Sequence, residues 1–547
     1  MPSPAQQIRA PLLWLLLPMM AGLAAAKVWP PPAAGLTLVL LGALGLAGVA
    51  LGAAWFDRPR AAMPALVGAA ALAGFALLHL REPRLHTGET RPPREITVTL
   101  LVTDIFGSAA GARSLGGLGE VVVAGDLDRE LVGQRVYFSA IRRISVGPRR
   151  EGGYEVRGVL EPLARDGAQD GFNDYLANRG VRLRLTRAQF IRETSPPGRW
   201  AQFTAAGRAR LDRILSHGLA RHPSTASLYL AMLLGEKAEL SPAQENAFMR
   251  SGTFHVFSVS GLHVGVIAGA LGLLGRTLRL PRRLEVVVTL VVLWLYVQVT
   301  GTGTPAVRAY IMIAFLLSSQ VFRLPGNALA ALAASALVTL LREPLELFST
   351  GFQMSYSVVA GLILLAGPLA DHWQTRWQPF ALKPRPEWRW WHDTIASGGR
   401  KVIAGVAGCW AAFLASAASG IGFFGVFSPG SLLANLIILP LSSLAIVAGF
   451  LSLLTGLIGL APLSALFNAA AALIIIASDW LLRHGTELPG VYYPASFRAG
   501  WLAPAGMAGM TAVLLAGAAG RWRKRYGGFW PPVVLLFLLL VLGVRFG

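Results

Sequence analysis

The sequence predicts a polytopic α-helical membrane protein that carries one small all-β domain. Hydrophobic residues make up 54% of the 547 positions and charged residues only 14%, a composition typical of membrane proteins rather than soluble enzymes. Apolar runs long enough to cross a bilayer recur along most of the chain. One long polar segment, residues 81–223, interrupts them and contains alternating strand patterns. With Cys409 as the single cysteine, an intrachain disulfide and a thiolate metal cluster are excluded.

Residues 1–80 are predicted to form the first transmembrane helices. Three apolar runs lie here, at 12–26, 35–56 and 63–80. The first run also has features of a signal peptide, but the two that follow favour an anchor helix. Arg58 and Arg60 separate the second and third runs. If this basic loop is cytoplasmic, the amino terminus is cytoplasmic and the segment after residue 80 is periplasmic.

Residues 81–199 are predicted to form the β domain. Ile96, Val98, Leu100 and Val102 alternate with other residues, as in a strand with one buried face. Four more segments have strand character, at 119–123, 135–144, 154–160 and 181–191. Turns that contain Gly, Pro and Asp separate them. Five short strands indicate a small barrel and are compatible with an OB-fold, although the periodicity alone does not select that topology.

The β domain is also a candidate nucleic-acid binder. Residues 81–223 contain 23 Arg, 16 acidic residues and no Lys. OB-folds that bind single strands combine a basic groove with aromatic stacking platforms. The candidate binding residues here are Arg142, Arg143, Arg182, Arg184, Tyr137 and Tyr154. The alternative is that the arginines form a solvated surface and the aromatic residues form the core of the barrel.

Residues 200–250 are predicted to form interfacial helices. Leu211, Ile214 and Leu215 recur at helical spacing on the face opposite Arg208 and Arg210. This amphipathic pattern predicts a helix that lies along the membrane surface before the membrane core begins.

Residues 251–482 are predicted to form the membrane core, and 483–547 the last transmembrane helices. The predicted spans lie near 254–275, 284–300, 304–322, 326–341, 351–370, 402–419, 430–457, 461–482, 501–518 and 529–545. The basic loops fall on one side, which supports the orientation given above. The run at 430–457 is long for one span, so a tilted, broken or re-entrant helix is expected there, with Asn435 and Pro440 at the break.

Polar residues inside the predicted spans are candidates for a hydrophilic path. The stretch 254–265 carries two histidines and two serines in an otherwise apolar context. On one continuous helix, His255 and His263 would lie about 80° apart. The candidate path residues are His255, Ser258, Ser260, His263, Arg308, Gln353, Ser355 and Asn435. Each has a structural alternative, since polar groups also join packed helices, and Arg308 could form an ion pair that braces the bundle instead of contacting a phosphate.

Several motifs in these segments resemble the signature of the ComEC competence family. They are Asp174-Tyr175-Leu176-Ala177-Asn178-Arg179-Gly180-Val181, Ser251-Gly252-Thr253-Phe254-His255, Val259-Ser260-Gly261-Leu262-His263-Val264-Gly265, Gly301-Thr302-Gly303-Thr304-Pro305-Ala306-Val307-Arg308-Ala309, Glu343-Pro344, Gly351-Phe352-Gln353-Met354-Ser355-Tyr356, and Asn435 with Pro440-Leu441. They occur in order over roughly residues 60 to 460. The resemblance implies a bacterial inner-membrane channel that passes single-stranded DNA into the cytoplasm during transformation, with an OB-like periplasmic domain.

The resemblance also sets expectations about partners. Family members often carry a metallo-β-lactamase-like domain, and no His-x-His-x-Asp-His cluster matches it here. A periplasmic DNA receptor, a cytoplasmic translocase and a separate nuclease are therefore expected as partners, together with single-stranded DNA and membrane lipids. A homo-oligomer is compatible with the sequence. We expect no cofactor, no metal site and no enzymatic activity.

Two other functions stay open at this point. One is a permease or flippase for another anionic polymer or lipid, since a fold does not determine its substrate. The other is an intramembrane hydrolase, in which Ser258 or Ser260 is the nucleophile and His255 or His263 is the base.

Overall fold

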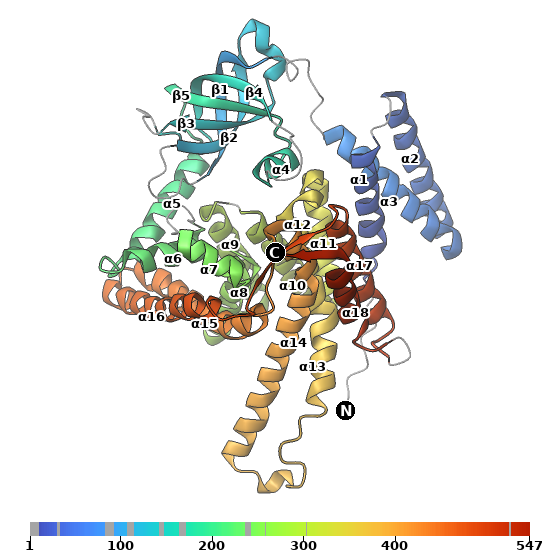
Figure 1. Cartoon of the computed structure of the whole chain (residues 1–547), viewed down its shortest axis with the longest axis vertical. Coiled ribbons are helices and arrows are strands. Elements are labelled where there is room, and N and C mark those ends of the chain that lie inside the picture. The colour runs from blue at the N-terminus through green and yellow to red at the C-terminus, as the bar shows by residue number, and fades with distance from the viewer. Residues whose placement is uncertain are drawn as a thin grey trace.

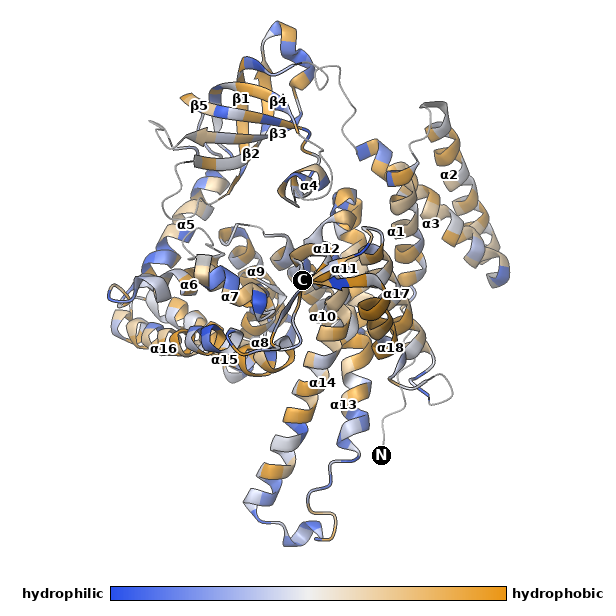
Figure 2. Ribbon diagram, viewed as in Figure 1, coloured by the Kyte–Doolittle hydropathy of each residue, from blue (hydrophilic) through white to orange (hydrophobic). Residues whose placement is uncertain are grey.

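A computed structural model describes residues 10–29, 33–81, 92–106, 114–141, 147–163, 171–235, 242–257, 259–301, 303–523 and 527–547. A β-barrel stands at one end of a large helical body, and a long helical hairpin projects from the opposite end (Figure 1). Among the described residues, eight helices are long and apolar enough to cross a membrane. Apolar residues predominate along the helices of this body (Figure 2). The predicted polytopic helical membrane protein with a small β domain is confirmed.

Three helices precede the barrel: α1 (Leu13–Val28), α2 (Ala33–Trp55) and α3 (Pro59–Arg81). Glycines allow α1 and α3 to approach closely. A Cβ at Gly22 would lie 1.9 Å from the carbonyl oxygen of Ala71, and one at Gly74 would lie 2.3 Å from that of Met19. Small residues at helix crossings are the usual means of tight packing in membranes. The first apolar run is thus a packed helix of the folded protein.

The barrel contains β1 (Arg94–Phe106), β2 (Ser114–Ala124), β3 (Arg135–Ile141), β4 (Gly153–Pro162) and β5 (Leu183–Ser195). All five predicted strands are present. They close in the order β1-β2-β3-β5-β4, with β3 and β5 parallel and β1 paired to β4. Val98, Leu100 and Val102 point into the barrel and are almost completely buried, as their alternation predicts.

Further helices lie between strands of the barrel and between the barrel and the helical body. The 3-10 helix η2 (Asp126–Leu131) follows β2, and α4 (Gly171–Asn178) lies between β4 and β5. After β5, α5 (Arg199–Ser216), α6 (Pro223–Leu234) and α7 (Pro242–Arg250) lead into the helical body. The buried Asn468 side chain donates to the carbonyl oxygens of Ile214 and His217, at 2.7 and 3.0 Å. These bonds satisfy carbonyl groups at the carboxyl end of α5.

The remaining elements form the helical body. In chain order they are η4 (Phe254–Phe257), α8 (Gly261–Thr277), α9 (Arg282–Val299), α10 (Thr304–Val321), α11 (Ala328–Arg342), η5 (Pro344–Phe348), α12 (Thr350–Gly361), η6 (Leu362–Ala366), α13 (Gly367–Gln374), η7 (Arg385–Glu387), α14 (Trp390–Phe424), α15 (Ser431–Leu457), α16 (Ala461–Thr486), α17 (Leu502–Ala519), α18 (Pro531–Leu538) and η9 (Leu539–Gly543). One hydrophobic core is formed mainly by α5–α10, α15 and α16, and a second by α11–α14, α17 and α18.

Two features of the predicted core are wrong. The stretch 254–275 is not one helix, because a 3-10 turn ends at Phe257 and α8 begins only at Gly261. Of the three forms considered for 430–457, the broken and re-entrant ones are absent, because α15 continues through Asn435 and Pro440. A proline removes only one backbone donor, and Ile438 and Ala445, both fully buried, pack this part of α15 against its neighbours. A small sheet of β6 (Val426–Phe427), β7 (Tyr493–Phe497) and β8 (Val544–Phe546) was not predicted.

Candidate functional site

The chain changes direction between η4 and α8, and Ser260 and His263 stabilise this change. The Ser260 backbone N–H donates to His263 Nδ1 at 3.2 Å, and Ser260 Oγ lies 3.0 Å from the same nitrogen. These contacts cap the first turn of α8 in the manner of a capping box. Because Nδ1 accepts a hydrogen bond, the neutral ring carries its proton on Nε2. His263 is fully buried, and Nε2 has no hydrogen-bond partner among the described residues.

The starts of α10 and α15 lie against η4, α8 and the residues just before them, and the start of α12 lies against α10. A Cβ at Gly261 would lie 3.5 Å from the Ala309 Cβ of α10, and one at Gly252 would lie 2.7 Å from the Ser431 Cβ of α15. Arg308 of α10 donates from Nη2 to the Gly351 carbonyl oxygen of α12 at 2.8 Å. The segments that carry the predicted path residues therefore come together. We call this meeting point of η4, α8, α10, α12 and α15 the polar junction.

Arg308 forms an internal brace within the polar junction. It is 4% exposed, and its Nη1 lies 3.7 Å from Oε2 of Glu346 in η5, which is also buried. Ser349 donates to the same Glu346 oxygen at 2.9 Å, and Ser335 donates to the Arg308 carbonyl oxygen at 3.1 Å. These contacts link α10, α11 and α12 through η5, as the structural alternative for Arg308 requires. Glu346 was missed in the sequence, where the need of a buried arginine for a counter-ion was the available signal.

The other path candidates occupy different positions. Gln353 donates from Nε2 to the Leu347 carbonyl oxygen at 3.0 Å, while its buried Oε1 has no partner among the described residues. The buried Oδ1 of Asn435 is likewise unpaired within the described chain. The Ser355 side chain is half-buried in α12, and that of His255 is exposed in η4. Ser258 lies outside the described residues. The polar junction thus contains several buried polar atoms that have no hydrogen bond.

Tyr154 does not form a stacking platform on the barrel. Its side chain is fully buried in the barrel core, and its ring packs edge-on against Phe190 with centroids 5.5 Å apart. The backbone N–H of Arg149 donates to the hydroxyl oxygen at 3.0 Å, which satisfies the buried polar group. The prediction for Tyr154 is wrong because the residue has the inward parity of Val156 on β4. For this side chain, the alternative of a core position is the correct one.

An aromatic and basic patch does exist on the outer surface of the barrel. Tyr137 of β3 packs against Phe172 of α4, with ring centroids 5.3 Å apart, and Tyr175 is stacked beside Phe172. The guanidinium of Arg184 lies 5.6 Å from the Tyr137 ring centroid. Burial raises the pKa of the Tyr137 hydroxyl, and the charge of Arg184 opposes this rise. Phe172 and Tyr175 are 41% and 38% exposed, so part of the patch is open to a ligand.

The remaining basic candidates of the barrel are less well defined. Arg182 is half-buried and lies directly before β5, which begins at Leu183. Arg142 and Arg143 lie outside the described residues. Phe172 and Tyr175 were not predicted as binding residues, because they lie in the short helix α4, whose position over the barrel depends on tertiary packing.

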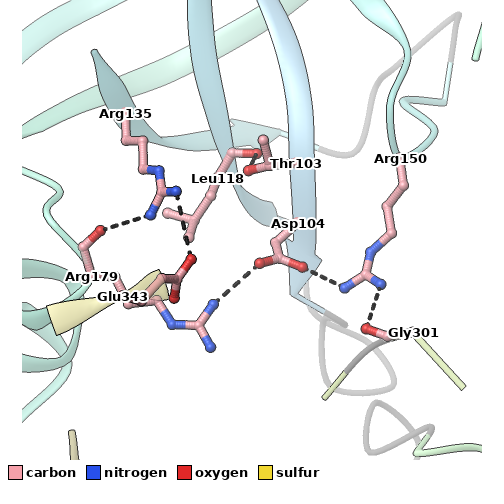
Figure 3. A network of polar contacts seen from close by, with 8 residues as sticks. All are labelled: Thr103, Asp104, Leu118, Arg135, Arg150, Arg179, Gly301 and Glu343. Carbon is pink, nitrogen blue, oxygen red and sulfur yellow. Dashed lines mark hydrogen bonds and ion pairs between the residues drawn. The ribbon is translucent and has the colours of Figure 1, made fainter. Parts of the chain in front are cut away.

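An ionic network attaches the barrel to the helical body (Figure 3). Asp104, near the end of β1, accepts from Arg150 at 2.5 Å and from Arg179 at 3.1 Å. Arg150 also donates to the Gly301 carbonyl oxygen at 2.9 Å, in the segment between α9 and α10. Arg135 of β3 lies 3.8 Å from Glu343 of the body. The barrel is therefore held over the segment that leads into the polar junction.

Comparison with known proteins places these features in a family. The sequence model of the family described as "Competence protein" matches residues 232–524, slightly more than half of the 547 residues. The chain belongs to this competence family. The matched region contains the whole polar junction, whereas the barrel lies outside it.

Two curated relatives cover parts of this competence-family chain. ComE operon protein 3 of Bacillus subtilis is 30% identical over 142 residues, which are 26% of this chain and 18% of that protein. Recombination protein 2 of Haemophilus influenzae is 27% identical over 173 residues, which are 30% of this chain and 21% of that protein. The alignments thus span about a fifth of the length of each relative. No solved structure matches the chain.

Proposed function

We propose that this competence-family protein passes single-stranded DNA across the bacterial inner membrane during natural transformation. The observation that supports the proposal most is the polar junction in the family-matched region. There, His263, Gln353 and Asn435 each hold a buried polar atom that lacks a hydrogen bond among the described residues. Buried polar groups are normally paired, and unpaired ones inside a membrane bundle are a common mark of a transport path.

The junction would contact the strand through several weak interactions. Conduction requires binding that is favourable enough for entry and weak enough for exit. A histidine N–H and two amide oxygens can exchange hydrogen bonds with water, sugars or bases without holding a strand tightly. His255, Ser258, Ser260 and Ser355 are proposed to line the same path. In this proposal Arg308 supports the junction through Glu346 and contacts phosphate only if that ion pair opens.

The barrel would receive DNA on the periplasmic side. Its strand order, closed β1-β2-β3-β5-β4, supports an OB-like assignment. The patch of Tyr137, Phe172 and Tyr175 beside Arg184 combines stacking surfaces with positive charge, as single-strand binders of this architecture do. Arg142, Arg143 and Arg182 are proposed to extend the basic surface. In this orientation the amino terminus is cytoplasmic.

Passage of the strand would involve no bond breaking by this chain. We propose that it needs no cofactor and no metal, and that a periplasmic DNA receptor, a cytoplasmic translocase and a separate nuclease act with it. If the helices of one chain do not enclose the path, several copies of the chain would assemble around it. Transport of another anionic polymer or lipid is the second candidate, and the half-exposed aromatic patch of the barrel favours a ligand with stacking bases over it.

The hydrolase alternative has one observation in its favour, the 3.0 Å contact between Ser260 Oγ and His263 Nδ1. The same nitrogen accepts the Ser260 backbone N–H, which is the role of a helix cap. Activated serine normally requires a base that is oriented by a third group, and His263 Nε2 has no such partner among the described residues. The geometry therefore supports a cap better than a nucleophile and base.

A stalled strand tests the proposal. Variants are made in a Cys409→Ser background, each with a single cysteine in place of His263, Gln353 or Asn435. Cells then take up DNA that carries a thiol-tethered base. A bulky block at the trailing end of the DNA stalls the strand during passage. We expect disulfides between the strand and these cysteines, but none with Ala472→Cys, which lies in the packed core between helices. Equal products at all positions, or at none while cells still import DNA, would contradict the proposed path.

A further inference from the structure

The helical hairpin of α13 and α14 ends in a tip that lies far from the barrel. Residues 375–389 connect the two helices, and the hairpin projects from the opposite end of the helical body (Figure 1). At 35 residues, α14 is the longest helix of the described chain. Its length exceeds what one bilayer crossing needs, because about 20 residues span the hydrocarbon core. The projecting part therefore requires a separate explanation.

The length of α14 places the tip of the hairpin in water, outside the bilayer. Residues 402–424 of α14 contain no charged side chain and extend over about 34 Å, enough to cross a hydrocarbon core of about 30 Å. Residues 390–401 add about 18 Å beyond that stretch. The headgroup layer on one side is only about 5–8 Å thick. Even at a tilt of about 40°, Trp390 would stand outside the headgroups, and polar residues gather at this end (Figure 2).

The tip is folded around four packed rings. His392 is buried and stacks on Trp391 with centroids 3.5 Å apart, while Phe380 packs edge-on against His392 at 4.6 Å and Trp388 at 5.6 Å. The Trp388 indole N–H donates to the Lys383 carbonyl oxygen at 3.0 Å. The Arg389 backbone N–H donates to His392 Nδ1 at 3.0 Å. These contacts fix the shape of the loop and so define the positions of the side chains on its outer surface.

The outer surface of the tip combines exposed aromatic rings with basic side chains, of which Arg385 lies 5.7 Å from the Trp388 ring centroid and Lys383 3.5 Å from His392 Nε2. Trp390 is 79% exposed, and Trp391 and Trp377 are 39% and 37% exposed. Six basic residues occur in residues 371–401: Arg376, Lys383, Arg385, Arg389, Arg400 and Lys401. Only three acidic residues occur there, Asp371, Glu387 and Asp393. Within the described chain, none of these basic side chains forms an ion pair.

We propose that this tip is a binding platform for single-stranded nucleic acid, which receives the strand as it leaves the helical body. Trp390 would stack on a base, and Arg389 and Arg385 would contact the neighbouring phosphates. Single-strand binders combine stacking rings with cations that follow the backbone. A lipid surface fits less well, because the tip stands beyond the headgroup layer. The inference rests on the proposed function, since it assumes that a strand emerges on this side.

The test measures binding by the full chain in nanodiscs of neutral lipid. A labelled thymidine 20-mer is titrated at several salt concentrations against wild type, Trp390→Ala and Arg389→Gln. Trp390→Ala should weaken binding about tenfold and leave the salt dependence unchanged, because stacking carries no charge. Arg389→Gln should reduce the slope of log K against log salt by about 0.7, the effect of one lost phosphate contact to a single strand. Trp501→Ala, which removes a ring that is 67% exposed outside the tip, should bind as wild type.

Photocrosslinking locates the bound strand without any substitution. An oligonucleotide with 5-iododeoxyuridine should crosslink to peptides within residues 377–400. Crosslinks confined to the barrel, or unchanged binding in both tip variants, would overturn the proposal. Tip tryptophan fluorescence that responds to anionic vesicles but not to the oligonucleotide would also overturn it, in favour of a lipid contact. If cells that lack the protein lose DNA import while the tip variants bind normally, the tip proposal fails and the channel proposal stands.

Discussion

The buried ion pair of Arg308 and Glu346 makes a strong prediction about stability. Both side chains are less than 10% exposed, so removal of one partner leaves a charge without its counter-ion in the bundle. Such a change typically destabilises a protein by about 3–5 kcal/mol. We expect Arg308→Met and Glu346→Leu each to lower the free energy of unfolding by an amount in this range.

The double variant distinguishes the brace from other roles. It loses the hydrogen bond from Arg308 to the Gly351 carbonyl oxygen, which is worth about 1 kcal/mol. It leaves no unpaired charge, however, so it should be more stable than either single variant. Because each single variant should lose about 3–5 kcal/mol and the double variant less than either, the coupling energy between the two positions should exceed about 3 kcal/mol.

Unfolding of the purified protein in detergent, followed by tryptophan fluorescence in a denaturant series, measures these changes. Arg342→Met serves as the control, since Arg342 is an exposed arginine of the adjacent α11, and it should shift the stability by less than about 1 kcal/mol. If both single variants unfold like wild type and yet abolish DNA import, Arg308 belongs to the path and the brace is refuted. Additive losses in the double variant would also refute the coupling.

Three further predictions concern the barrel and the cap. Asp104→Asn should weaken docking of the barrel by about 1–2 kcal/mol, because two partly exposed arginine contacts lose their charge, and hydrogen exchange at the strand end should rise. Gly301→Ala should also loosen docking, since its Cβ would lie 2.8 Å from Arg150 Nη1 on a backbone with a φ of +92°. Gly303→Ala is the control and should not loosen docking, because its Cβ would have no atom within 4 Å. The yield of crosslinks between the barrel and the helical body compares the two variants. Ser260→Ala should destabilise the protein by about 1 kcal/mol and preserve DNA import in a transformation assay, whereas a serine hydrolase would lose its activity completely.

Much of the barrel is predictable because strand periodicity depends on local sequence. The alternation from Ile96 to Val102 gives both the strand and its buried face, and all five strands occur where turn residues separate such patterns. The closure order is not local, because the parallel pairing of β3 with β5 joins segments about fifty residues apart. Tyr154 is buried because alternate residues of β4 point into the barrel and it is one of them. The alternation alone does not show which face of the strand is the inner one, because that depends on how the barrel closes.

The polar junction contains contacts that no local sequence pattern predicts. Hydropathy predicts one membrane segment at 254–275, yet the helix begins at Gly261 because Ser260 and His263 cap it. Spacing along an assumed helix therefore gives the wrong relation between His255 and His263. The partner of Arg308 is Glu346, 38 residues away in a different element. Such pairs depend on helix packing in three dimensions, which a single sequence does not encode in any local pattern.

The most direct test of the central proposal is the uptake of labelled DNA into the cytoplasm of transformable cells. Three strains are compared: wild type, a deletion of this gene, and His263→Leu with normal membrane levels of the protein. We predict that the deletion abolishes entry into the cytoplasm while DNA still reaches the periplasm, and that His263→Leu strongly reduces entry. Normal import in the deletion strain would contradict the proposed channel and would leave transport of another anionic substrate as the function to test.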